Sequence, residues 1–258
     1  AVGYQAGYSA TQHQQYSVFI GKQSGHNMTT GTNNTFLGYY TGALLGHADA
    51  DDNVFIGTAA GASGDYTTAN NTSNKNVGIG KSAMGGATAD TVFEADNNVA
   101  IGYESLKSIL SGSNNVAVGS GSADALTTGA SNVVLGYNAL TTATTAHSNV
   151  VLGQTAMENI PAGETVNNAV AIGFEALKGS GSTTNAIVGT IAIGRQSLQS
   201  LTTGARNTAI GYESAKNNAT GTDGTFLGYQ SGLNSLLNYN TGVGAYTLQK
   251  LGTTGGGG

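Results

Sequence analysis

The sequence repeats one short pattern along almost its whole length: a β-branched residue, a small or apolar residue, an aliphatic residue and then glycine. The stretch NNVAIGYESLKSILSGSNNVAVG at 97–119 contains the pattern twice, with its glycines seventeen residues apart. A unit of this size cannot bury its apolar side chains alone, so it must stack on its neighbours as a solenoid. Fourteen anchor glycines follow the pattern: Gly3, Gly21, Gly38, Gly57, Gly80, Gly102, Gly119, Gly136, Gly153, Gly173, Gly194, Gly211, Gly228 and Gly244.

The positions around each anchor glycine hold consistent residue types. The residue before the glycine is Val, Ile or Leu in all fourteen copies, and the residue three before it is Val, Ile or Thr in the thirteen copies that reach so far. β-branched residues at alternate positions predict a short strand. Glycine after the strand predicts a corner. Ala, Ser or Thr three residues after the glycine predicts a second short strand, packed tightly against the first, before a polar turn.

We therefore predict an all-β protein, a parallel β-solenoid of about fourteen coils over residues 1–251 with a Gly-rich flexible end at 252–258. Asn stands four before the anchor glycine in nine of thirteen copies, among them Asn98 and Asn115. This column predicts a ladder of amide side chains that bond from coil to coil, as stacked Asn rows do in cross-β assemblies.

The residue two before the anchor glycine is apolar throughout. A simple solenoid is expected to turn this position to solvent and fill it with polar residues. An apolar residue here therefore predicts a strand buried on both faces, covered by a further copy of the chain. A monomer with an adhesive apolar stripe is the alternative. The candidates for the subunit interface are Phe19, Phe36, Phe55, Ala100, Ala117, Val134, Val151, Ala171, Ala192, Ala209 and Phe226.

Charge and hydropathy exclude several classes of function. Charged residues make up only 9% of the chain and its net charge is -5, which argues against nucleic-acid binding because phosphates require a basic surface. No apolar run approaches the roughly 18 residues that span a bilayer, so we expect no membrane insertion in this segment. The absence of cysteine excludes disulfides and thiolate metal sites.

The sequence offers no catalytic constellation, and we do not expect an enzyme. Its Ser and Thr residues lack a nearby His or acid in a common motif. The stretch IGKS at 79–82 superficially resembles a phosphate loop, but Lys75 stands where that motif requires glycine. The histidines fall in polar turns of different coils, which predicts no shared metal site. They are His13, His26, His47 and His147.

Acidic residues gather at 47–53 and 89–98. Carboxylate and amide oxygens there match the ligands of Ca²⁺, although the same residues also suit a solvated turn. We expect no resident cofactor, and calcium is the one candidate ion.

An aromatic residue follows the anchor glycine in half of the coils. We interpret these rings as packing coil on coil or covering a subunit seam, and stacking on sugar rings is the alternative. The residues are Tyr4, Tyr39, Tyr103, Tyr137, Phe174, Tyr212 and Tyr229.

Four units are longer than the rest, with their extra residues in the turns at 61–75, 85–98, 157–168 and 179–190. Departures from a regular repeat are where such proteins place specific contacts, so we predict that these turns form bulges that touch a cell-surface glycan or protein. Tolerated variation in loop length is the alternative. The candidate contact residues are Asp65, Tyr66, Phe93 and Glu94.

The repeats NNVAIGYESL (97–106), NNAVAIGFEAL (167–177) and RNTAIGYESA (206–215) resemble the N-x-A-I-G repeats of trimeric autotransporter adhesin heads of the YadA type. With the recurring TTG turns they resemble the repetitive shafts of bacteriophage tail fibres still more closely. The resemblance covers nearly the full chain. It implies a left-handed parallel β-roll assembled as a homotrimer, located outside the cell or on a virion, with a role in attachment and no assigned binding residue.

From the residues and the resemblance together we expect a structural and adhesive extracellular fibre segment, such as a tail-fibre or adhesin shaft that mediates or presents attachment to a host or surface. A self-assembling extracellular filament without a specific ligand is the alternative.

Overall fold

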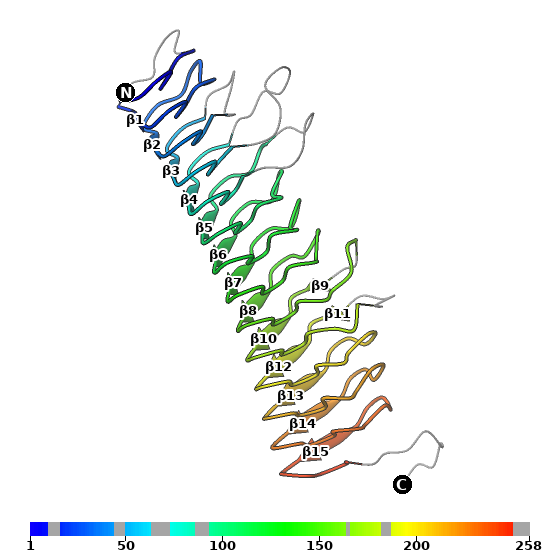
Figure 1. Ribbon diagram of the computed structural model, residues 1–258. Helices are drawn as coiled ribbons and strands as arrows, with labels where there is room; N and C mark the ends of the chain where they lie inside the picture. The colour runs from blue at the N-terminus through cyan, green and yellow to red at the C-terminus, as the bar shows by residue number, and fades with distance from the viewer. Residues whose placement is uncertain are drawn as a thin grey trace. The chain divides into compact units, whose positions relative to one another are not determined.

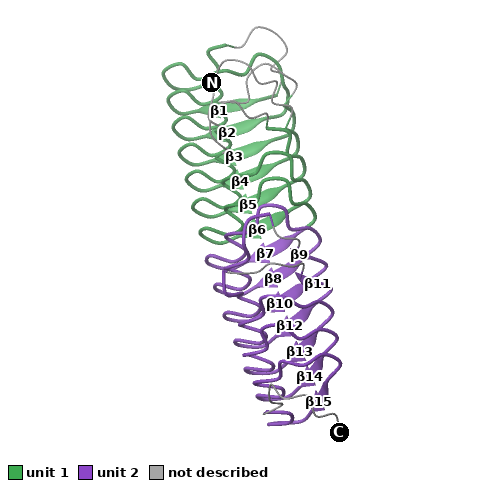
Figure 2. Ribbon diagram, turned by 90° about the vertical axis from the view of Figure 1, so that its right-hand side faces the viewer, with its two compact units in different colours: residues 1–131 green, residues 132–258 purple. Residues whose placement is uncertain are grey.

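The computed structural model describes residues 1–9, 16–43, 50–62, 73–85, 93–163, 166–181 and 187–249. These residues form short β-strands joined by turns and contain no helix (Figure 1). They belong to two compact units, Ala1–Ser131 and Asn132–Gly258 (Figure 2). The predicted flexible end at 252–258 lies outside the described residues.

Unit 1 is a parallel β-solenoid in which each strand pairs with the next strand along the chain. Equivalent positions of the repeat lie opposite one another, so that Phe19 faces Phe36 across the first pair. Val2 extends this arrangement through a parallel bridge to Ile20. The strands of unit 1 are β1 (Val18–Ile20), β2 (Thr35–Leu37), β3 (Val54–Ile56), β4 (Val77–Ile79), β5 (Val99–Ile101) and β6 (Val116–Val118).

Unit 2 is built in the same way, with one addition. Its main strands also pair in parallel with matched repeat positions. Two long units of the sequence add a second sheet, in which β9 (Val166–Asn167) pairs in parallel with β11 (Ile187–Val188) (Figure 1). The main strands are β7 (Val133–Leu135), β8 (Val150–Leu152), β10 (Val170–Ile172), β12 (Ile191–Ile193), β13 (Thr208–Ile210), β14 (Thr225–Leu227) and β15 (Thr241–Val243).

The predicted parallel β-solenoid is thus confirmed in each unit, but the second short strand of each coil is not found in the described residues. The chain after the anchor glycine forms turns instead. The second and fourth residues after the glycine adopt left-handed backbone, as at Glu104 (φ 56°) and Leu106 (φ 47°). Left-handed residues at alternate positions prevent an extended strand, so that prediction was wrong.

The anchor glycines turn the corner that ends each main strand. Their φ angles lie between 114° and 147°, a region that side chains strongly disfavour. The coils also approach closely here, since a Cβ built on Gly57 would lie 2.7 Å from the carbonyl oxygen of Gly80 in the next coil. Backbone angle and backbone contact therefore both require glycine.

The residue two before each anchor glycine, which we call the inner column, points into its own coil. It is the buried centre of all thirteen main strands among the described residues. The prediction that this column contacts a partner chain was therefore wrong, because its side chains are enclosed by one chain alone. The predicted interface residues are all at most 4% exposed. They are Phe19, Phe36, Phe55, Ala100, Ala117, Val134, Val151, Ala171, Ala192, Ala209 and Phe226.

Complementary side chains fill the interior of each coil. Where the inner column holds phenylalanine, as at Phe36, the fourth residue after the anchor is glycine, here Gly42. A Cβ on Gly42 would lie 2.5 Å from the Phe36 ring. At Ala100 the fourth residue after the anchor is the large side chain of Leu106, and both residues are fully buried. In most coils a small residue at one of these two positions is therefore matched by a larger one at the other, although two coils hold alanine at both.

The asparagine ladder is confirmed in the structure. Asn53 donates two hydrogen bonds to Asn34 Oδ1 of the preceding coil, from its backbone N–H (3.0 Å) and its Nδ2 (3.1 Å). Its Nδ2 also donates to the carbonyl oxygen of Ser73 (2.8 Å). The same bonds continue along unit 1 through the buried amides of Asn76, Asn98 and Asn115.

Candidate interaction surface

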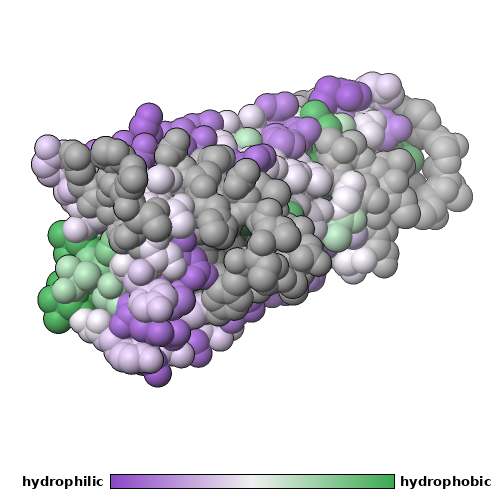
Figure 3. All heavy atoms as spheres, turned by 90° about the horizontal axis from the view of Figure 1, so that it is seen from above, coloured by the Kyte–Doolittle hydropathy of each residue, from purple (hydrophilic) through white to green (hydrophobic). Residues whose placement is uncertain are grey.

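An apolar surface lies on the outer side of the main strands. The residues three before and one before each anchor glycine point outward from both units, and we call them together the apolar outer face. Ile20, Leu37 and Ile101 in unit 1 are 41%, 44% and 37% exposed, and in unit 2 Leu135 and Ile210 are 40% and 39% exposed. Figure 3 shows hydrophobic residues gathered on one side of the chain beside hydrophilic ones. Aliphatic side chains are thus open to solvent on successive coils.

The apolar outer face is also uncharged. Its two positions hold only Val, Ile, Leu or Thr in every copy of the repeat. Side chains on neighbouring strands repeat at the strand spacing of about 4.8 Å. Each unit therefore presents a regular aliphatic array rather than isolated exposed residues, and such a patch is unusual on a protein that has no partner.

Aromatic and cationic residues follow most of the anchor glycines and form a column that borders this face. Lys22 Nζ lies 6.0 Å from the centroid of the Tyr4 ring and 5.8 Å from that of Tyr39. In unit 2 the Arg195 guanidinium lies 5.4 Å from the rings of both Phe174 and Tyr212. These cations lie over ring faces on neighbouring coils, a favourable geometry at the surface.

For Tyr212 and Tyr229 the contacts distinguish coil-to-coil packing from stacking on sugar rings. Tyr212 stacks on Tyr229 with ring centroids 5.4 Å apart and planes inclined by 14°. Packing from coil to coil is therefore confirmed for these rings. A sugar ring would need an open aromatic face, and Tyr212 has Arg195 over its ring as well as this stacked neighbour.

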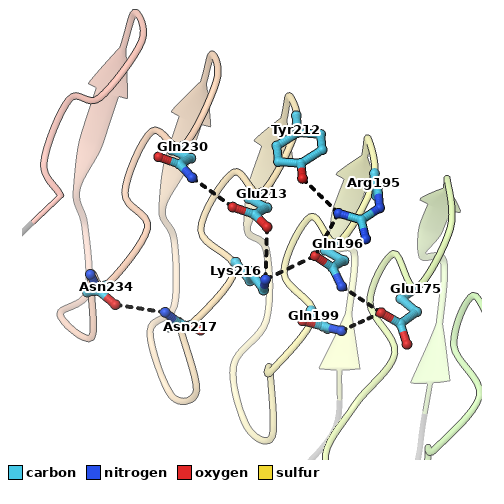
Figure 4. Close-up of polar contacts among 10 residues, drawn as sticks. All are labelled: Glu175, Arg195, Gln196, Gln199, Tyr212, Glu213, Lys216, Asn217, Gln230 and Asn234. Carbon is cyan, nitrogen blue, oxygen red and sulfur yellow. Dashed lines mark hydrogen bonds and ion pairs between the residues drawn. The ribbon is translucent and has the colours of Figure 1, made fainter.

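Unit 2 carries a network of polar side chains beside the aromatic column (Figure 4). Glu175 Oε2 accepts hydrogen bonds from Gln196 Nε2 and from Gln199 Nε2, both at 2.7 Å. Lys216 Nζ donates to Gln196 Oε1 and to Glu213 Oε1, both at 2.9 Å. We call the members of this network the polar strip: Glu175, Arg195, Gln196, Gln199, Glu213, Lys216 and Gln230.

The hydrogen bonds of the polar strip keep its carboxylates ionised. Donation from Gln196 is the main reason that the pKa of Glu175 is lowered, and Lys178 adds to it. Donation from Lys216, followed by Gln230, lowers the pKa of Glu213. Both groups therefore carry full negative charge at neutral pH.

Two of the described acidic residues in the two acidic stretches accept hydrogen bonds from the backbone of a neighbouring coil. Asp51 Oδ1 accepts from the Thr32 N–H (2.6 Å), and Asp96 Oδ1 accepts from the Asn74 N–H (2.7 Å). Among the residues that the structure describes, no three His, Cys, Asp or Glu side chains are grouped to hold a metal ion. Residues 44–49 and 86–92 lie outside that part of the chain, so calcium binding stays a prediction.

Of the histidines, two lie in the described residues and two do not. His26 stacks on Tyr8 with ring centroids 5.3 Å apart, and its Nδ1 lies 2.7 Å from Asn27 Oδ1. His147 forms a parallel bridge with Asn167. His13 and His47 are outside the described residues.

Of the four residues predicted to contact a ligand in the long turns, one is buried, one is exposed and two lie outside the described residues. Phe93 is only 1% exposed, so that prediction was wrong, because a ring enclosed in the coil cannot touch a surface ligand. Glu94 is exposed, and its backbone N–H donates to the Leu110 carbonyl oxygen (2.7 Å). Asp65 and Tyr66 lie outside the described residues.

No family model, curated protein or solved structure matches the chain. The search for membrane spans found no helix in the described residues that is long and apolar enough to cross a bilayer. Functional inference therefore depends on the surfaces themselves.

The sequence interpretation missed the apolar outer face because it assigned the two sides of the strand the wrong way round. A signal for the correct assignment was present. In many copies a large residue in the inner column faces glycine at the fourth residue after the anchor and a small one faces a large residue there, as in the pairs Phe226–Gly232 and Ala171–Leu177. Such compensation marks two positions that share a core.

Proposed function

We propose that this chain is a structural segment of an extracellular fibre, a tail-fibre or adhesin shaft, that associates with further copies of itself through its apolar outer face. The observation that carries the proposal is the uncharged aliphatic array on the outer side of the main strands. The inner column fills the coil, and the outer residues lie partly exposed on the other side of the same strands. They remain available to another chain.

A second copy is the partner that fits best. The outer side chains repeat at the strand spacing of about 4.8 Å, and a second solenoid presents the same repeat. Contacts can therefore recur at every coil, as they do when two sheets pack face to face. Burying aliphatic surface contributes roughly 25 cal/mol per Å² before the cost of association, so many small contacts accumulate.

The number and arrangement of the chains follow from the resemblance of the repeats to autotransporter heads and phage shafts. We propose a homotrimer of left-handed solenoids outside the cell or on a virion, in a structural rather than catalytic role. The TTG turns and the N-x-A-I-G repeats support this choice. A filament without a specific ligand is the second candidate, favoured by the Asn ladder, which bonds coil to coil in the manner of a purely structural element.

Sedimentation velocity over a range of protein concentrations tests the association. The wild-type chain is expected to sediment as a trimer. The double variant Leu37→Glu/Ile101→Glu places charges in the outer face and is expected to sediment as a folded monomer, because burying unpaired carboxylates opposes association. Ser111→Glu, a charge at an exposed turn of the same unit, serves as the matched control and should leave the trimer intact.

Circular dichroism of each variant establishes that the coil itself is retained. A wild-type chain that stays monomeric at every concentration would overturn the proposed association. If the folded double variant still forms trimers, the interface is not the apolar outer face. A wild-type chain that sediments as a dimer would contradict the proposed subunit number.

A further inference from the structure

The polar strip of unit 2 differs from the rest of the repeat in what it offers a ligand. Successive coils place Glu175, Gln196, Glu213 and Gln230 at the same position, two residues after their anchor glycines. The equivalent position in unit 1 includes small side chains such as that of Ala59. Carboxylates and amides in a row supply both donors and acceptors, which is the combination that hydroxyl groups require.

The side chains of the strip are held in place before any ligand arrives. Gln230 Nε2 donates to Glu213 Oε2 (2.7 Å), which ties one coil to the next. The Glu213 and Glu175 side chains are only 14% and 16% exposed, and that of Lys216 is 25% exposed. Little rotamer freedom is then left to lose, and this lowers the cost of binding.

Hydrogen-bonding capacity nevertheless remains. Arg195 Nη1 donates to Gln196 Oε1 (3.2 Å) and to the Tyr212 hydroxyl (2.7 Å). A guanidinium carries five donor hydrogens, so these two bonds leave further donors on Arg195. An ionised carboxylate accepts about four hydrogen bonds, and Glu213 receives one on each oxygen from Lys216 and Gln230.

The charges of the strip and its flanking residues cancel. Three carboxylates stand against three cations, which gives zero net charge. A neutral surface of this kind selects against polyanions, which need an excess of basic residues, and against polycations. The residues counted are Glu158, Glu175, Glu213, Lys178, Arg195 and Lys216.

Aromatic side chains line one edge of the strip. Tyr212, Tyr229 and Tyr246 are 40%, 43% and 58% exposed on consecutive coils. Tyr229 and Tyr246 meet edge to face, with planes inclined by 76°. Exposed ring edges and hydroxyls next to amides form a surface that is partly apolar and partly polar, as the surface of a sugar is.

We propose that the polar strip binds a neutral, linear polysaccharide. The polysaccharide would run from coil to coil, along the direction in which the coils of unit 2 stack. Contacts repeat at about 4.8 Å from coil to coil, a spacing similar to the length that one sugar adds to an extended glycan. The inference rests on the proposed function, since it assigns an attachment site to the fibre, but it concerns a different surface from the association of chains.

Affinity electrophoresis in native gels tests the proposal on the full chain. The probes are a galactomannan, hydroxyethyl cellulose and dextran as neutral polysaccharides, with alginate as the acidic one. We expect at least one neutral polymer to retard the wild-type protein. Gln196→Ala/Gln230→Ala removes two amides of the strip without changing charge and should weaken the apparent affinity about tenfold, which is roughly 1.4 kcal/mol.

The matched control is Gln5→Ala/Gln23→Ala, which removes two glutamines from the same repeat position in unit 1. All four positions have left-handed backbone, with φ between 50° and 57°, so both variants impose a similar backbone penalty. The control should be retarded as the wild type is. Sedimentation of each variant separates loss of association from loss of sugar binding.

Absence of retardation by every neutral polymer would overturn the proposal. So would retardation by alginate alone, or equal retardation of the strip variant and the control. A trimeric wild type that binds none of the neutral polymers would leave the proposed fibre role standing while removing this site.

Discussion

At the scale of single residues, buried amides link each coil to the next beside the apolar core. Each Asn of the ladder bonds mainly to the following coil, through its acceptor oxygen and its Nδ2. Buried polar groups that are fully bonded cost little, whereas leaving one unpaired costs about 1–3 kcal/mol. The ladder therefore makes neighbouring coils depend on one another.

Asn98→Ala should destabilise unit 1 by roughly 3 kcal/mol, because it leaves several buried partners unpaired. The amide of Asn98 accepts from the backbone N–H and the Nδ2 of Asn115 and donates to the Gly112 carbonyl oxygen. Urea denaturation followed by circular dichroism measures the loss. Asn97→Gly at the exposed neighbour, where φ is 57°, is the control and should be neutral or stabilising. Equal stability of Asn98→Ala and wild type would refute the structural role of the ladder.

Asp124 is expected to destabilise the protein at neutral pH. Its Oδ1 is buried without a hydrogen-bond partner, and burial raises the pKa of the carboxyl above its usual value. A raised folded-state pKa means that the ionised form costs stability, a cost present above the folded pKa and absent below the unfolded value of about 3.9. Asp124→Asn should therefore raise the thermal midpoint at pH 7 and leave it unchanged at pH 3.

Asp223→Asn is the control, and it is expected to change the thermal midpoint at pH 7 in the opposite direction. The Arg206 guanidinium donates to both oxygens of Asp223 (2.7 and 2.9 Å) and lowers the pKa of that carboxyl. The stability that this pair contributes is present above the unfolded pKa and is lost as the pH falls through the folded one. The control should lower the midpoint at pH 7 only. A decrease for Asp124→Asn at pH 7 would contradict the assignment of an unfavourable buried charge.

At the scale of the element, each coil is a small core with its own solution to filling space. The Phe36 ring stacks between those of Phe19 and Phe55, with centroids 5.3 and 5.6 Å apart. Glycine at the fourth position after the anchor makes room for such rings. Most coils with a small inner residue place a larger side chain there instead, as Ala100 and Leu106 do, so the two positions pack against each other.

The swap Phe36→Ala/Gly42→Leu should recover much of the stability that each single variant loses. Phe36→Ala alone creates a cavity that costs about 3–5 kcal/mol, and Gly42→Leu alone forces a side chain against the Phe36 ring. Together they reproduce the arrangement of Ala100 and Leu106, which tolerates left-handed Leu. A double-mutant cycle of unfolding free energies should give a coupling above about 1 kcal/mol. Additive effects would show that the two positions do not share a core.

The sequence was sufficient to place the main strands but not to orient them. Val99, Ala100 and Ile101 read as a strand from their alternation and from the glycine that follows. Successive side chains of a strand point to opposite faces, but this does not show which face lines the interior of the coil. Here the residues on both faces are apolar. The inner face is identified by packing, because only two residues that share the interior of a coil need side chains whose sizes compensate for each other. The turn after the anchor was missed because Glu104 and Leu106 are not typical residues for left-handed backbone.

At the scale of the whole molecule, the two units share the repeat and the apolar outer face but differ in the polar residues beside it. Unit 2 carries the polar strip, and Figure 4 shows that its residues come from successive coils. Composition alone did not reveal the strip, because glutamate and glutamine at one repeat position become a network only when neighbouring coils are in register. The long turns chosen from the sequence lie partly outside the described residues, and Phe93 shows how an apolar turn residue can belong to the core.

The phase of the repeat has a consequence for how such a gene changes. Loss of residues 99–115 would join Asn98 directly to Val116 and leave the asparagine, the strand and the anchor glycine in their places. Deletion or duplication of one whole repeat can therefore shorten or lengthen the protein by one coil while the asparagine, the strand and the anchor glycine stay in register. The length of the solenoid can therefore change in steps of one coil, while the surfaces of the remaining coils stay the same.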